Sequence, residues 1–101
     1  MEEEIPLPDL HHSEIDDETL EELFLDIGTH THIVEIIPKF GPGYVAENPD
    51  TLQLDEAYQM LAKRQLNSLQ IRYVHEGITW WDTLTPMSGG LFRIVRIQHD
   101  F

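Results

Sequence analysis

Apolar residues recur at helical spacing in two segments of the chain. In the first segment they lie at i, i+3, i+4 and i+7, as Leu20, Leu23, Phe24 and Ile27. In the second segment the stripe runs one position further, as Leu54, Ala57, Tyr58, Leu61 and Ala62. We therefore expect helices over residues 15–26 and 54–66. Ser13 or Asp16 can cap the first helix, and Gly28 is a suitable stop.

Four other segments have the composition of strands. Residues 29–37 are rich in β-branched side chains, and Pro38 either ends this strand or marks it as an edge. Residues 69–75 and 78–84 flank Glu76 and Gly77, a pair that predicts a tight hairpin. Residues 91–98 form the last predicted strand.

The predicted order of elements is α-β-α-β-β-β, which indicates an α+β fold. Its simplest form is an antiparallel sheet of about four strands with the two helices packed on one face. Pro6 and Pro8 disfavour regular structure near the start of the chain. We therefore expect an extended acidic arm over residues 1–12 and a single globular domain over residues 13–101.

The hairpin predicts which side chains share a face of the sheet. With Glu76 and Gly77 as the loop residues, Trp81 lies opposite Arg72 on the polar face, where an indole–guanidinium stack can form. This pair can either stabilise the outer face or anchor a partner. A shift of the turn by one residue would exchange Trp80 and Trp81 between the two faces.

The same register places Asp82 on the apolar face, where it needs a partner. The candidates are a helix N-terminus, a tyrosine hydroxyl, Arg93 or Arg96. A structural hydrogen bond is the plainest reading of a buried carboxylate. A catalytic acid or base is the alternative, although no matching nucleophile or second acid lies beside it in the sequence.

Negative charge is concentrated at one end of the chain. Residues 1–26 contain eleven Asp or Glu and no Lys or Arg, whereas residues 27–101 contain eight acids and six bases. The helix dipole explains the acids at the start of the first helix. It leaves Glu21, Glu22 and Asp26 unexplained, and these three residues indicate a binding surface for a basic protein.

The histidines raise the question of a metal site. If residues 29–37 form a strand, His30 and His32 point to the same face and could hold zinc or nickel together with further ligands. No metal or nucleotide motif accompanies them, and the chain has no cysteine. We therefore expect no cofactor.

These features favour a small non-enzymatic interaction domain that binds a basic protein. The expected contact residues are Glu21, Glu22, Asp26, Arg72, Trp81 and Tyr44. One alternative is an enzyme-like domain with a small-molecule or metal pocket near Phe40, Tyr44 and Asp82. A second alternative is an acidic mimic of nucleic acid.

Charge and hydropathy also bear on location and assembly. A net charge of −13 disfavours direct binding to nucleic acid or to anionic membranes. The first residues do not resemble a signal peptide, and no segment is apolar enough to span a bilayer, so we expect a cytoplasmic protein. An unpaired edge strand near residues 29–37 could support a homodimer.

Overall fold

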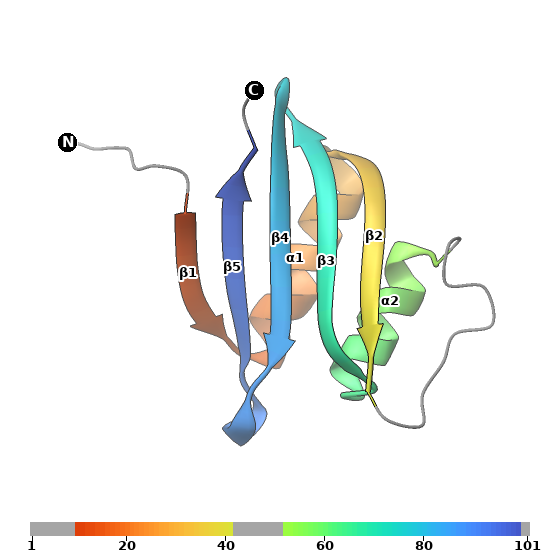
Figure 1. Cartoon of the computed structure of the whole chain (residues 1–101), viewed down its shortest axis with the longest axis vertical. Coiled ribbons are helices and arrows are strands. Elements are labelled where there is room, and N and C mark those ends of the chain that lie inside the picture. The colour runs from red at the N-terminus through yellow and green to blue at the C-terminus, as the bar shows by residue number, and fades with distance from the viewer. Residues whose placement is uncertain (1–9, 42–51, 100–101) are drawn as a thin grey trace.

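Five strands form one antiparallel sheet in the order β1-β5-β4-β3-β2 (Figure 1). The computed structural model describes residues 10–41 and 52–99. The strands are β1 (Leu10–Ile15), β2 (His32–Phe40), β3 (Leu66–His75), β4 (Ile78–Pro86) and β5 (Phe92–Gln98). The helices are α1 (Asp17–His30) and α2 (Leu54–Ala62), and a single 3₁₀ turn, η2 (Ser88–Gly90), joins β4 to β5. The α+β class and the antiparallel sheet are therefore confirmed.

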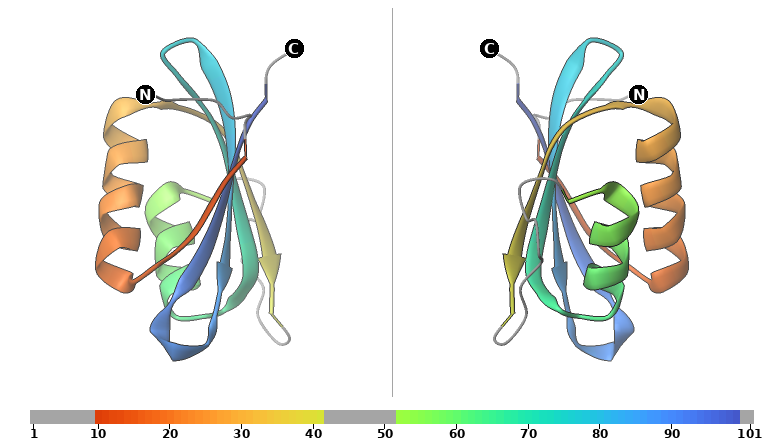
Figure 2. Two further views of the ribbon diagram at one scale, coloured as in Figure 1. Left: turned by 90° about the vertical axis from the view of Figure 1, so that its left-hand side faces the viewer. Right: turned by 90° about the vertical axis from the view of Figure 1, so that its right-hand side faces the viewer.

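Both helices cover the same face of the sheet, and no helix of the described residues lies on the other face (Figure 2). Leu20, Phe24 and Ile27 of α1 and Ala57 and Leu61 of α2 are buried against the sheet. The sheet contributes Leu66, Leu69, Ile71, Tyr73, Leu84, Phe92 and Ile94 to the same core. Each helix buries one face against the sheet, which explains why the apolar stripes predicted the helices well. Neither α1 nor α2 is long and apolar enough to cross a membrane.

The sheet has one strand more than the sequence predicted. Strand β1 pairs antiparallel with β5, from Leu10 opposite Ile97 to Ile15 opposite Phe92. The predicted boundary between arm and domain, at residues 12 and 13, falls inside this strand. The strand was missed because its two apolar residues, Leu10 and Ile15, stand at its ends and give no clear alternation. Its pairing with β5 defines it.

Helix α1 begins later and ends later than predicted. Asp16 caps it, and its Oδ1 accepts a hydrogen bond from the Thr19 backbone N–H at 2.9 Å, which lowers the pKa of Asp16. Gly28 does not stop the helix, which continues to His30. A Cβ at position 28 would lie 3.1 Å from Leu54 Cδ2. The glycine therefore permits close contact between α1 and α2.

Strand β2 starts at His32, so the prediction of a strand from residue 29 was wrong at its beginning. Within residues 10–41 and 52–99 it pairs only with β3, and it includes Pro38, which an edge strand tolerates because one side of the backbone needs no partner. The register shifts between Ile33 and Glu35, and Val34 is 58% exposed there. These bulges obscure the alternation of side chains along the strand.

Helix α2 is shorter than predicted because a capping motif of backbone hydrogen bonds ends it. The Gln65 N–H donates to Met60 O and the Arg64 N–H donates to Leu61 O, both at 2.9 Å. Arg64 takes the left-handed conformation, with φ 58°, that completes this Schellman motif. The chain then reverses, and Leu66 begins β3 as a buried residue.

The β3–β4 hairpin has the predicted register. Trp81 lies opposite Arg72 and Ile71 lies opposite Asp82, as the two-residue loop requires. Glu76 and Gly77 both have positive φ, 53° and 80°, which is the signature of a type I′ turn. A positive φ strains the glutamate and suits the glycine.

The turn gives the first testable prediction. We expect Gly77→Ala to lower the free energy of unfolding by about 1 kcal/mol, because alanine resists the left-handed conformation. Glu76→Asn should raise it by roughly 0.5 kcal/mol, since asparagine tolerates that conformation better. Urea unfolding measures both changes. Equal stability of the two variants would contradict the turn geometry.

Candidate functional site

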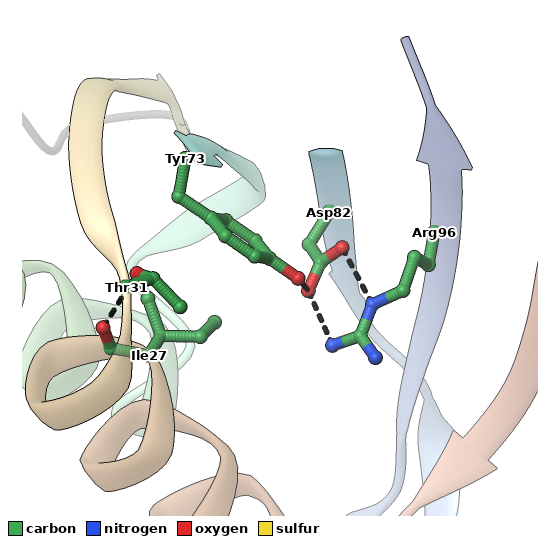
Figure 3. A network of polar contacts seen from close by, with 5 residues as sticks. All are labelled: Ile27, Thr31, Tyr73, Asp82 and Arg96. Carbon is green, nitrogen blue, oxygen red and sulfur yellow. Dashed lines mark hydrogen bonds and ion pairs between the residues drawn. The ribbon is translucent and has the colours of Figure 1, made fainter. Parts of the chain in front are cut away.

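Asp82 lies at the centre of a buried polar network that joins three strands (Figure 3). Its side chain is fully buried. Oδ1 accepts a hydrogen bond from Arg96 Nε at 2.9 Å, and Oδ2 accepts bonds from Arg96 Nη2 at 2.7 Å and Tyr73 Oη at 3.0 Å. The predicted need for a partner is therefore met by two of the expected residue types, a tyrosine hydroxyl and Arg96.

Burial and charge reinforce each other in this network. Burial, followed by the negative charge of Asp82, raises the pKa of Tyr73 well above its ordinary value, so the phenol remains a donor. The hydrogen bonds to Asp82 raise the pKa of Arg96. Both oxygens of the carboxylate are occupied by donors from the protein. This arrangement suits a structural ion pair better than a catalytic acid or base.

A pocket of about 300 Å³ lies beside the network and is lined by Tyr73, His75, Trp80 and Arg96. Phe40 does not line it. Phe40 lies opposite Leu66, five residues away along β3 from the Ile71 position that faces Asp82. Tyr44 lies outside the described residues. Phe40 is therefore distant from Asp82 along the sheet, and the enzyme-like pocket stays a prediction.

Trp81 lies on the face of the sheet opposite the helices, because side chains alternate and Asp82 points inward. The Arg72 guanidinium carbon is 3.9 Å from the indole centroid, which confirms the predicted stack. His99, which directly follows the neighbouring strand β5, stacks against the same tryptophan with ring centroids 4.0 Å apart. Trp80 lines the inner pocket, and both tryptophans are half-buried.

Further contacts hold Arg72 in place on this outer face. Its Nη1 lies 3.3 Å from Glu35 Oε1, and its Nε donates to Gln70 Oε1 at 2.8 Å. Gln70 in turn donates to Thr83 Oγ1 at 3.1 Å. The arginine and the tryptophan therefore form a prearranged surface rather than two independent side chains.

The acidic helix forms a different surface. Glu21, Glu22 and Asp26 are all exposed on α1, as the prediction of an acidic outer patch requires. Helix α1 contains five Asp or Glu, helix α2 contains two more, and neither contains Lys or Arg. The helical layer is thus strongly negative at its surface.

A groove of about 500 Å³ runs between the two helices. We call it the α1–α2 groove. Among the described residues, ten line it: Glu21, Phe24, Leu25, Gly28, Thr29, Gln53, Leu54, Asp55, Tyr58 and Gln59. Leu25 is 64% exposed, and the Phe24 and Tyr58 rings lie 5.2 Å apart. Burial, with the charges of Glu21 and Asp17, raises the pKa of Tyr58.

The groove therefore has apolar walls and acidic rims. Glu21 supplies one rim from α1, and Asp55 supplies the other from α2. Glu22 and Asp26, four residues apart, form the adjacent outer stripe of α1. The acids were predicted from the sequence, but the groove was not. Leu25 was a signal for it, because it is an apolar residue of the helix that lies outside the buried stripe.

The predicted contact residues separate into two surfaces. Glu21, Glu22 and Asp26 belong to the helical layer, whereas Arg72 and Trp81 belong to the opposite face of the sheet (Figure 2). One flat partner surface cannot contact both sets at once. The structure therefore does not bring together the acids and the tryptophan that the sequence reading combined.

His30 and His32 do not share a strand, and this expectation was wrong. His30 ends α1, Thr31 follows as the C-cap, and His32 begins β2. The Thr31 hydroxyl donates to Ile27 O at 2.6 Å, which fixes this change of direction (Figure 3). Among the described residues, no group of three or more His, Cys, Asp or Glu is arranged to hold a metal ion.

Comparison with protein-family models, curated proteins and solved structures finds no match for this chain. Functional inference therefore rests on the geometry of its own residues.

The buried network gives a second testable prediction. Arg96→Met should lower the free energy of unfolding by about 3–5 kcal/mol, because it leaves a buried charge without its ion-pair partner. Tyr73→Phe should cost about 1–2 kcal/mol through the loss of one donor. Both are measured by urea unfolding.

A double variant separates charge from packing. Asp82→Leu with Arg96→Met removes both charges and keeps similar volumes, so it should be more stable than Arg96→Met alone. A double variant less stable than Arg96→Met would contradict the buried ion pair as the cause.

Proposed function

We propose that this chain is a non-catalytic interaction domain that binds a basic protein through the α1–α2 groove. The observation that carries the proposal is the combination of apolar walls with acidic rims in one groove. The occupant that fits is a basic amphipathic helix. Its apolar residues would enter the groove, and its Lys or Arg side chains would meet the rims.

Three features of the groove support this choice of partner. Phe24, Leu54 and Tyr58 offer aromatic and aliphatic contact to apolar side chains. Glu21 and Asp55 stand on both sides of that contact, so a cation on either edge of a helix finds an acid. The outer stripe of Glu22 and Asp26 extends the negative field beyond the groove and would speed association.

The described residues favour no second function to the same degree. The carboxylate of Asp82 is saturated by donors from Tyr73 and Arg96. The two histidines proposed as metal ligands lie on different elements. An acidic mimic of nucleic acid would also use the helical acids, but it would not need an apolar groove between them.

The third testable prediction concerns charge at the groove. The probe is a synthetic amphipathic helix with Leu at i, i+4 and i+7 and Lys on its flanks. Glu21→Gln with Glu22→Gln should weaken its binding about tenfold, since one rim contact and one contact of the outer stripe, each worth up to about 1 kcal/mol, are lost. Isothermal titration calorimetry at low salt measures the change.

A matched control distinguishes the local patch from bulk charge. Glu14→Gln with Glu76→Gln removes the same charge from exposed positions outside the helices, so it should change binding less than threefold. Leu25→Ser should weaken binding while leaving its salt dependence unchanged. If the two charge variants behave alike, or if a peptide with Gln in place of Lys binds equally well, the groove does not select a basic partner.

A further inference from the structure

The face of the sheet opposite the helices is a second surface that the proposed function does not use. We call it the open face. No described helix packs on it (Figure 2). Trp81 lies near its middle between Arg72 and His99. Apolar side chains surround this stack, as the alternation along the strands requires: Ile37, Val74, Val95 and Ile97.

The ion pair inside the molecule fixes which residues reach the open face. Asp82 and Arg96 lie opposite each other and point inward. Their neighbours Trp81 and Ile97 are also opposite each other and must therefore point outward. Ile97 is accordingly 40% exposed.

The open face differs from the helical layer in charge. Among its described side chains are two acids and three bases: Glu14, Glu35, Lys39, Arg72 and Arg93. The two helices of the helical layer carry seven Asp or Glu and no Lys or Arg. Two copies of a chain with net charge −13 repel each other, and this repulsion is weakest when they meet through a surface without excess acid. The open face is such a surface.

The size of the open face matches the needs of a homodimer. Strands of 6 to 10 residues at about 3.3 Å per residue, spaced about 4.8 Å apart, give a flat area of roughly 600 Å². Two copies would bury about 1,200 Å² in total, the lower end of the range for stable interfaces. Tryptophan and arginine at the centre are the residue types that dominate such contacts.

We propose that the open face is a self-association surface, on which a second copy packs sheet against sheet with Trp81 and Ile97 at the centre. This contact differs from pairing along the β2 edge, which the sequence alone suggested. It leaves the α1–α2 groove of each copy on the outside of the dimer. The proposal therefore does not depend on the proposed function.

Sedimentation equilibrium over about 1–500 µM protein tests the proposal. The wild-type chain should dimerise with a dissociation constant in the micromolar range. Ile97→Glu should raise that constant at least about tenfold, because it places a charge at the interface centre. Ile97→Ser is a milder second variant with the same expected direction. Thermal melting checks that each variant is folded.

Two control variants locate the contact. Leu25→Glu changes an exposed apolar residue of the helical layer and should leave dimerisation unchanged. Val34→Lys changes an exposed residue of the β2 edge and should also leave it unchanged. In NMR spectra, the indole N–H signal of Trp81 should shift with protein concentration more than that of Trp80.

Three results would overturn the proposal. The first is a wild-type chain that stays monomeric at about 500 µM, well above a micromolar dissociation constant. The second is a dimer that folded Ile97→Glu and Ile97→Ser leave intact. The third is a dimer that Val34→Lys or Leu25→Glu dissociates instead, which would place the contact on the β2 edge or on the helices.

Discussion

The ion pair between the buried Asp82 and the half-buried Arg96 determines more of this structure than any other contact. It joins β4 to β5, and Tyr73 extends it to β3. Because side chains along a strand alternate between the two faces of the sheet, a residue held on the inner face places its neighbours on the outer face. Trp81 and Ile97 point outward since Asp82 and Arg96 cannot leave the interior without breaking a saturated network. One interior contact thus sets the composition of an exterior surface.

The second constraint is that both helices cover the same face of the sheet. This arrangement collects the acids of α1 and α2 on one side of the molecule and leaves a nearly neutral, partly apolar face on the other. Gly28 lets the helices approach closely at Leu54, and the α1–α2 groove lies beside that contact. The two proposed surfaces therefore follow from one packing arrangement, and they favour partners of different charge.

The sequence predicted those features that depend on local chemistry. The Glu76–Gly77 turn fixed the register of β3 against β4, and the register placed Asp82 inside and Trp81 outside. Prediction from the sequence failed where contacts between distant segments determine the structure. Strand β1 exists through its pairing with β5, and α1 continues past Gly28, where the lack of a side chain permits close contact with Leu54 of α2. The histidine pair was misread for the same reason, since the helix carries His30 away from His32.

The central claim is that opposite sides of the molecule carry surfaces of different electrostatic character. Salt distinguishes them in a single experiment. Sedimentation velocity of the chain with a basic amphipathic peptide, from about 50 to about 500 mM NaCl, follows both associations together. We predict that peptide binding weakens with salt while self-association strengthens, because screening removes attraction at the groove and repulsion between the acidic copies. If both associations weaken or strengthen together, the two surfaces are not electrostatically distinct and the account is wrong.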